Sequence, residues 1–182
     1  DYSVHNYVVN GLPAALPGQA INLTLTNPGD GDEFSVSSAA GENLLGIQLA
    51  LVDYHTPEVL TYPGGVVSAD TTRYWIAHPV WRSAVGEADN KSYDVSYDYS
   101  NNPNINIEGQ LQLLYKEDNA ADPWETTGSS PNVGSNTIGV SNVDPLNHKE
   151  YLLGGTSLAT FDININPPAT PSPVSGPIEV CS

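Results

Sequence analysis

The chain has 182 residues, and its 21 acidic side chains outnumber the five Lys and Arg side chains to give a formal net charge of −16. This surplus excludes nucleic acid as a partner, because phosphates need cationic side chains. It also excludes binding to an anionic membrane surface. No run of about 18 apolar residues is present, so we expect no membrane insertion. A highly soluble extracellular domain fits this charge balance.

The length suffices for one large all-β domain that buries a core without disulfides. Cys181 is the only cysteine, so no internal disulfide is available and the redox compartment stays open. The chain begins at Asp1, without Met or a signal peptide. We therefore expect a processed product or an excised piece of a longer protein.

Residues 1–10 predict a first strand that is apolar on both faces. Its apolar side chains are Tyr2, Val4, Tyr7, Val8 and Val9. Residues 11–18 are rich in Gly and Pro and predict a hinge. Such a segment either pairs locally as an ordinary strand or leaves to complete a neighbour's sheet, as a donor strand.

Short alternating segments follow and predict further strands. Residues 20–26 and 33–38 are expected to form a hairpin around a Gly- and Asp-rich turn. Residues 44–52 form a longer apolar run, for which we predict a central strand covered on both sides. Pro79 lies inside the aromatic segment 72–81 and predicts a break or an edge there.

Residues 92–99 carry the clearest alternation in the chain. Tyr93, Val95, Tyr97 and Tyr99 fall on one side of an extended chain, and Ser and Asp residues fall on the other. Successive side chains of a strand point to opposite faces, so this segment has one buried and one wet face. We predict that it is a central strand of an antiparallel sandwich.

The second half of the chain continues the pattern of short strands. We expect one strand over residues 105–115 with a bulge at Gly109, and a short one beginning at Pro123. Two more should flank a turn at residues 144–145, and residues 158–166 should close the domain.

Residues 167–177 contain five prolines and predict a semi-rigid polyproline II spacer. Ile178 and Val180 then look like the opening of another strand. We predict an all-β, antiparallel β-sandwich of Greek-key, immunoglobulin-like or jelly-roll type, with about ten to twelve short strands. The sandwich spans residues 1–166, of which 1–19 are the first strand and hinge, and residues 167–182 are a linker and the start of a following module.

Four motifs occur in a suggestive order: Arg73-Tyr74-Trp75, the run 92–99, Leu-Gln-Leu-Leu-Tyr-Lys at 111–116, and Pro-Trp-Glu at 123–125. This order resembles a β-sandwich module of large secreted multidomain surface proteins of Bacteroidota. Tyr97 stands where that module has Phe. Residues 175–181 resemble the opening of a polycystic-kidney-disease-like module. The resemblance covers residues 70–182 and implies an extracellular sandwich array used in adhesion, gliding or filament building, with no catalytic residues.

Asp30, Asp32 and Glu33 form the sharpest acidic cluster and are candidate Ca²⁺ ligands. Calcium takes about six to eight oxygen ligands, and an Asp-Gly-Asp turn gathers several of them. The full twelve-residue EF-hand loop is missing, however. An ordinary turn on a strongly acidic surface is the open alternative, and no other cofactor is expected.

Two further residue types raise candidate sites. His5, His55, His78 and His148 have no metal-binding spacing, so a metal or catalytic role requires them to converge in space. Asn22 and Asn90 each begin an Asn-x-Ser/Thr sequence and are candidate N-glycosylation sites.

We hypothesise that the chain is an extracellular structural or adhesive module, a subunit or segment of a cell-surface filament or adhesin. Its partners would be copies of itself or neighbouring modules, joined head to tail through the first strand and through Ile178 and Val180. The alternative is a carbohydrate-binding module, in which exposed aromatic side chains bind glycans. The available aromatics are Tyr54, Tyr62, Trp81 and Trp124. A secreted hydrolase would need a cleft with paired carboxylates, and no pair stands out, so we expect no enzyme.

Overall fold

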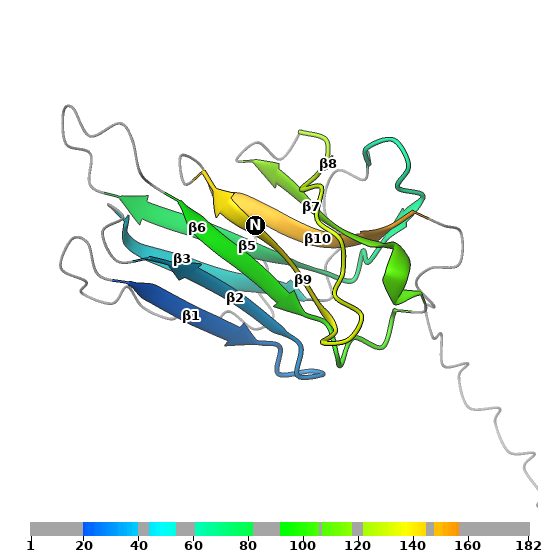
Figure 1. The fold of residues 1–182 in the computed structure, drawn as a ribbon, viewed down its shortest axis with the longest axis horizontal. Coiled ribbons are helices and arrows are strands. Elements are labelled where there is room, and N and C mark those ends of the chain that lie inside the picture. Colours follow the sequence, from blue (N-terminus) through cyan, green and yellow to red (C-terminus); the bar gives the residue numbers. More distant parts are fainter. Residues whose placement is uncertain are drawn as a thin grey trace, which may run out of the picture.

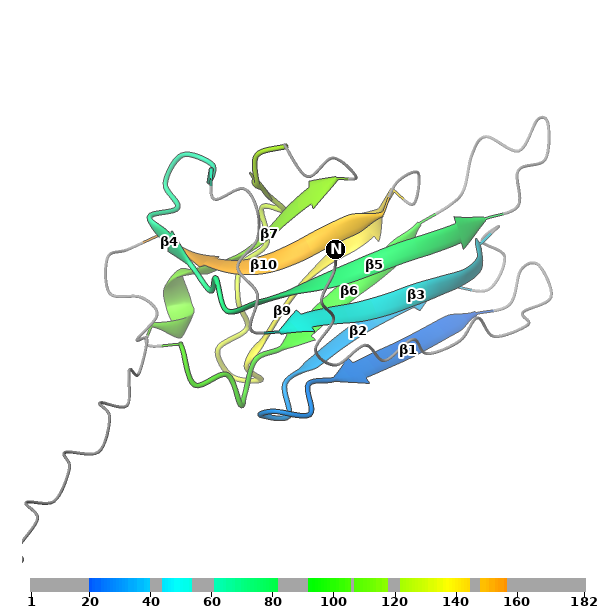
Figure 2. The same ribbon diagram turned by 180° about the vertical axis from the view of Figure 1, so that it is seen from behind.

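The computed structural model describes residues 20–39, 44–53, 61–81, 92–105, 107–117, 122–144 and 148–156. Two antiparallel sheets pack face to face, which confirms the predicted all-β sandwich (Figures 1 and 2). Within these ranges no helix is long and apolar enough to cross a bilayer. The first strand, the hinge, the closing strand and the Pro-rich linker lie outside the described residues. So do their assembly residues Tyr2, Val4, Tyr7, Val8, Val9, Ile178 and Val180.

One sheet has four strands in the order β1-β2-β6-β9. These are β1 (Ile21–Thr26), β2 (Glu33–Ser38), β6 (Tyr93–Asp98) and β9 (Thr137–Val143). β1 and β2 form the expected hairpin, with Leu23 opposite Val36. β6 lies between β2 and β9, so the prediction of a central strand over residues 92–99 is confirmed.

The other sheet has six strands in the order β3-β5-β10-β7-β8, with β4 paired to β10. These are β3 (Leu44–Asp53), β4 (Ser68–Ala69), β5 (Arg73–Trp81), β7 (Leu111–Glu117), β8 (Glu125–Thr126) and β10 (Lys149–Gly155). Every described pairing in both sheets is antiparallel.

An aromatic cluster joins the two sheets at the centre of the core. The rings of Phe34 and Trp75 stack with centroids 5.3 Å apart, and Tyr151 lies 5.4 Å from Phe34. Tyr97 meets Trp75 edge-on at 5.6 Å. Such pairs add about 0.5–1.5 kcal/mol each beyond the apolar area they bury. The alternation of β6 places its tyrosines here, because only one face of the strand looks into the sandwich.

The predicted position of β3 is wrong. Among the described strands β3 pairs only with β5, so it lies at an edge of the six-stranded sheet rather than in its centre. Its core face carries Ile47, Leu49 and Leu51, while Gln48 on the other face is half-buried. The apolar run predicts the burial of β3 but not its place in the sheet: Ala50 on the outer face is only 8% exposed, although β3 is an edge strand.

Pro79 occupies an edge-like position inside β5. The ladder between β5 and β10 extends from Trp75 to Ala77, whereas the ladder with β3 continues through Pro79. A proline, which lacks the N–H donor, is tolerated where a strand has a neighbour on only one side. The expectation of an edge at Pro79 therefore holds.

The predicted strand over residues 105–115 starts too early. The chain forms a single 3₁₀ turn, η1 (Glu108–Gln110), and β7 begins only at Leu111. Ile107 is exposed, so the apolar alternation of this segment does not correspond to a buried face. Gly109 lies within the 3₁₀ turn instead of a bulge.

A second, smaller apolar cluster covers the outer face of the six-stranded sheet. Its buried members are Ala69, Tyr74, Leu114, Trp124 and Leu152. Residues 61–67 contribute partly buried side chains to it, which explains why a Trp close to a loop is buried. The six-stranded sheet is thus apolar on both faces over part of its width.

Candidate functional site

Buried charged side chains meet at the end of the sandwich where the β1–β2 turn, the start of β5 and the end of β6 come together. We call this group the Arg73 network. Its members are Asp30, Asp32, Asp70, Arg73, Tyr97, Asn101 and Asn102. It lies directly beside the aromatic centre of the core, because Tyr97 belongs to both.

The β1–β2 turn is built to aim two carboxylates inward. The N–H of Asn27 donates to the carbonyl oxygen of Asp32 at 2.7 Å, and the N–H of Gly31 donates to the carbonyl oxygen of Asn27 at 2.8 Å. Gly31 has a φ of 91°, which glycine adopts without the clash that a Cβ would cause. Asp30 and Asp32 flank this glycine, and their side chains both reach Arg73.

Arg73 forms ion pairs with three carboxylates from two parts of the chain. Its Nη1 binds Asp30 Oδ2 closely and lies 3.4 Å from Asp32 Oδ2. Its Nε lies 3.8 Å from Asp70 Oδ2. The Arg73 side chain is only 8% exposed, so these contacts are largely shielded from water. The planar guanidinium suits such a role because its donors point in several fixed directions.

Tyr97 and Asn102 extend the network across to β6. The Tyr97 hydroxyl donates to Asp32 Oδ2 at 2.7 Å. The Asn102 amide Nδ2 donates to Asp70 Oδ2 at 3.0 Å and to the Tyr97 hydroxyl oxygen at 3.2 Å. The backbone N–H of Asn101 donates to Asp32 Oδ1 at 3.2 Å. Asp32 is therefore held by groups from both sheets.

Burial dominates the electrostatics of this network. Loss of hydration raises the pKa of Asp32 to about 6, and the negative charge of Asp30 adds to that rise. Burial and the neighbouring Asp32 raise the pKa of Tyr97 well above its usual range. Burial opposes the charge of Arg73, but the adjacent carboxylates outweigh it and raise its pKa further. Arg73 thus stays cationic at every working pH.

The geometry of the network argues against a metal centre at the predicted calcium ligands. The carboxylates of Asp30 and Asp32 converge on the guanidinium of Arg73, which already supplies the positive charge a cation would bring. Glu33 turns away and accepts a hydrogen bond from Thr26 Oγ1 at 3.4 Å. Within the described ranges no group of three or more His, Cys, Asp or Glu side chains could hold a metal ion. These contacts give the calcium hypothesis no support.

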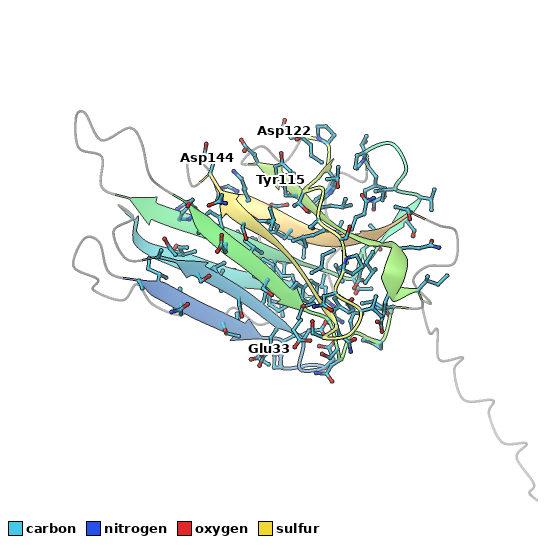
Figure 3. The ribbon with its side chains drawn as sticks, in the orientation of Figure 1. Glu33, Tyr115, Asp122 and Asp144 are labelled. Atoms are coloured by element: carbon cyan, nitrogen blue, oxygen red, sulfur yellow. The ribbon has the colours of Figure 1, made fainter. Side chains whose placement is uncertain are left out.

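A second group of polar residues surrounds an open cavity of about 290 Å³. We call it the lateral cleft. Its described lining residues are Tyr115, Glu117, Thr126, Thr127, Val140, Ser141, Asn142, Val143, Asp144, Lys149 and Tyr151. They come from β7, β8 and β10 of one sheet and from β9, the outer strand of the other. Figure 3 shows Tyr115 and Asp144 at this side of the molecule, away from Glu33.

Glu117 and Lys149 form an ion pair in the lateral cleft. They face each other directly in the β7–β10 register, and Lys149 Nζ donates to Glu117 Oε1 at 2.8 Å. The Lys149 side chain is 7% exposed and that of Glu117 is 44% exposed. Both lie on the core face of their strands, because Lys149 is two residues from Tyr151 and Glu117 is four residues from Leu113, and these two side chains point into the sandwich.

Two tyrosine hydroxyls of the lateral cleft are already paired. The Tyr115 hydroxyl donates to Glu125 Oε2 at 2.8 Å, and this hydrogen bond raises the pKa of Tyr115 to about 12. The hydroxyls of Tyr151 and Tyr93 lie 3.1 Å apart on the core side. The tyrosines therefore offer ring surface to the cavity rather than spare hydroxyl groups.

The wall formed by β9 contains a bulge. The register between β6 and β9 shifts between Tyr93 and Val95, and Asn142 has a φ of 59°. The backbone N–H of Asn142 donates to Asp94 Oδ1 at 2.9 Å, which holds this left-handed conformation in place. Bulges bend a strand and redirect its side chains, and they are frequent beside binding sites.

Two of the four histidines come together. His78 and His148 lie opposite each other at the end of the β5–β10 ladder, with ring centroids 5.8 Å apart. His78 is exposed and His148 is half-buried. Sequence spacing could not reveal this pair, because 69 intervening residues separate them. His5 and His55 lie outside the described residues.

The remaining predicted site residues are scattered. Asn22 is exposed on β1, as expected for a glycosylation acceptor, and Asn90 lies outside the described residues. Trp124 is 1% exposed, with Lys116 Nζ 5.4 Å from its ring centre, so it is not available as an exposed aromatic for the carbohydrate-binding alternative. Tyr62 is half-buried against the same outer cluster. Tyr54 lies outside the described residues, and Trp81 is the last residue of β5.

Sequence reasoning missed Arg73 as the centre of a site, although it singled out Asp30 and Asp32. One signal was available: the chain has two arginines and 21 acids, so a buried arginine will meet carboxylates. The lateral cleft left no such signal, because its residues come from four strands. Together the fold and these sites define an antiparallel β-sandwich with one closed and one open polar region. No known protein family, curated protein or solved structure matches the chain.

Proposed function

We propose that the chain is an extracellular structural or adhesive module of a cell-surface assembly. The observation that carries this proposal is the Arg73 network, in which buried ionic groups bind one another and leave no room for a substrate. Asp32 is fully buried, and Asp70 is 2% exposed. In this proposal the buried carboxylates and the guanidinium of the Arg73 network hold the β1–β2 turn, β5 and β6 together as one rigid unit.

A network of this kind favours a single arrangement of the sandwich. Each buried charge costs several kcal/mol of hydration, roughly, and this cost is offset only when partners lie in the right geometry. Alternative packings of the two sheets would separate Arg73 from its carboxylates. A structural or adhesive module requires such rigidity. The net charge of −16 makes separate copies repel one another, which opposes non-specific aggregation.

Assembly is proposed to proceed by strand addition at a sheet edge. Among the described strands β1 pairs only with β2, so its other side is available to an extended segment. The first ten residues of a neighbouring copy are the proposed donor, through Tyr2, Val4, Tyr7, Val8 and Val9. Ile178 and Val180 are the proposed contact at the other end. A head-to-tail contact of this type builds a fibre when it does not close into a ring.

The test removes the proposed donor strand. Residues 1–10 are deleted in one variant and replaced by a Gly/Ser segment of equal length in a second. Electron microscopy and light scattering then measure the length of assemblies formed by each. We expect both variants to remain single particles while the parent chain forms strings. Strings of unchanged length in either variant would remove the strand-exchange form of the proposal.

The rival function, a carbohydrate-binding module, requires a row of exposed aromatic side chains that stack on sugar rings. In the described part of the chain Trp124 is buried and Tyr62 is half-buried, so neither contributes to such a row. A hydrolase would need accessible paired carboxylates, whereas Asp30, Asp32 and Asp70 lie against Arg73. That the chain is not an enzyme stays a prediction, which an assay against polysaccharide substrates would check.

A further inference from the structure

The lateral cleft lies where the sandwich opens at its side, between β9 of one sheet and β7, β8 and β10 of the other. Its volume of about 290 Å³ lies just below the range for ligand pockets, about 300–1,000 Å³. A single six-membered ring with its substituents is a ligand of suitable size.

Two features keep the sheets from closing over this space. The first is the Glu117–Lys149 ion pair, which occupies positions on the core face of an antiparallel sheet that ordinarily carry apolar residues. The second is the bulge in β9 with Asn142 in the left-handed region, a conformation that costs a β-carbon-bearing residue about 1–3 kcal/mol. Either feature alone disfavours a sealed apolar seam. Their coincidence on opposite walls of one cavity indicates a built site.

The charges of the lateral cleft disfavour an anionic ligand. Glu117 and Asp144 line it, and the whole chain carries −16, so an anion is repelled. The ammonium of Lys149 is already paired with Glu117, so it does not offset this repulsion. An uncharged ligand does not meet this penalty.

The polar groups match a ligand that both donates and accepts hydrogen bonds at several points. The hydroxyl of Ser141 and the side-chain amide of Asn142 offer donors and acceptors, and the carboxylates offer acceptors only. Val140 and the ring of Tyr115 supply apolar surface beside them. A pyranose ring has this combination, with hydroxyls around its rim and C–H groups on its faces.

We propose that the lateral cleft binds one uncharged sugar ring, as a unit of a glycan. The inference deepens the proposed adhesive role, because the glycan would be what the module adheres to. Assembly and sugar binding use different parts of the molecule. Strand addition is assigned to β1, and the cleft is lined by β9, which is the outer strand at the other edge of the four-stranded sheet. Their failures can therefore be told apart.

The experiment titrates the ¹⁵N-labelled full chain with methyl glycosides of glucose, galactose, mannose and N-acetylglucosamine and follows backbone amide shifts. Glucuronate serves as the anionic comparator. We expect saturable shifts, confined to residues 126–127 and 140–144, with at least one neutral glycoside, and at least tenfold weaker binding of glucuronate. Absence of saturation with every neutral glycoside, or equal binding of glucuronate, overturns the proposal.

Matched tryptophan variants test the position of the site. Ser141→Trp places a large ring at the mouth of the cleft on β9, and Thr126→Trp does the same from β8; both native side chains are exposed. Thr26→Trp on β1, the other outer strand of the four-stranded sheet, is the control. We expect at least tenfold weaker binding in whichever cleft variant retains the parent spectrum outside the cleft, and unchanged binding in the control. Equal binding by the parent and a folded cleft variant overturns the assignment.

Discussion

The Arg73 network and the lateral cleft are both polar regions inside one sandwich, and they differ in how completely the protein satisfies them. In the network, Asp32 receives hydrogen bonds from Tyr97 and Asn101 and faces Arg73, with no exposed surface left. In the cleft, Glu117 has Lys149 as a partner and still exposes 44% of its side chain. The first region is closed by its own residues, and the second leaves space.

This difference teaches where buried charge contributes to stability and where it contributes to binding. A buried ion pair is strongly damaged when one partner is removed, because the other charge stays behind without compensation. A pair that reaches water loses little, because solvent replaces the missing partner. The same substitution should therefore have unequal effects in the two regions, and the predictions below use that contrast.

The largest effect is expected from Arg73→Met. The substitution keeps a side chain of similar length but leaves Asp30, Asp32 and Asp70 without their common cation, which should lower the free energy of unfolding by about 3–5 kcal/mol. Lys149→Met in the cleft is the matched comparison, because it leaves Glu117, which is 44% exposed, to be hydrated by solvent, with an expected loss of about 1 kcal/mol or less. Urea unfolding followed by Trp fluorescence measures both. Equal losses would erase the distinction between the two regions.

A smaller effect is expected from removing one hydroxyl. Tyr97→Phe leaves the ring in the core but deprives Asp32 and Asn102 of a buried hydrogen-bond partner, at a cost of about 1–3 kcal/mol. Tyr115→Phe removes a hydroxyl that bonds Glu125 near the surface, and we expect a change within about 0.5 kcal/mol. Thermal unfolding of the two variants side by side gives the comparison. A loss on Tyr115→Phe as large as on Tyr97→Phe would show that the cleft is as tightly closed as the network.

Tyr97 also shows how far sequence reasoning reaches. The alternation of residues 92–99 predicts that Tyr97 is buried, because period-two patterns fix which face of a strand looks inward. It does not predict that the Tyr97 hydroxyl meets Asp32, since that contact joins residues 65 positions apart in sequence. Likewise, the Arg73-Tyr74-Trp75 motif places its three side chains in three environments: the network, the outer cluster and the core.

Neither the lateral cleft nor the edge position of β3 could be predicted from the sequence, and the reason is the same. Which strands neighbour each other depends on long-range pairing, and an apolar run such as 44–52 is compatible with a central or an edge strand. The burial of Trp124 depends on residues 61–67, which pack over it from elsewhere in the chain. Local pattern predicts faces of strands, whereas sheet order decides which faces meet.

The most delicate difference between the two regions should appear in pH dependence. Because burial raises the pKa of Asp32 to about 6 from 3.8, the folded state holds a proton on this group that the unfolded state releases. The resulting stabilisation is fully present below about pH 4 and is lost as the pH rises through about 6. The free energy of unfolding of the parent chain should therefore fall between pH 4 and pH 7, relative to Asp32→Asn, which cannot titrate at this position.

Glu33→Gln is the matched control for that measurement, because it removes one carboxylate from the adjacent, exposed position. The 21 acids of the chain repel one another more strongly as they ionise, so part of any pH dependence is general and should persist in both variants. Only the difference between the parent curve and the Asp32→Asn curve reports on the network. Parallel curves for the parent and Asp32→Asn from pH 4 to pH 7 would contradict the prediction. They would mean that Arg73 and Tyr97 keep the Asp32 carboxylate ionised over this whole pH range.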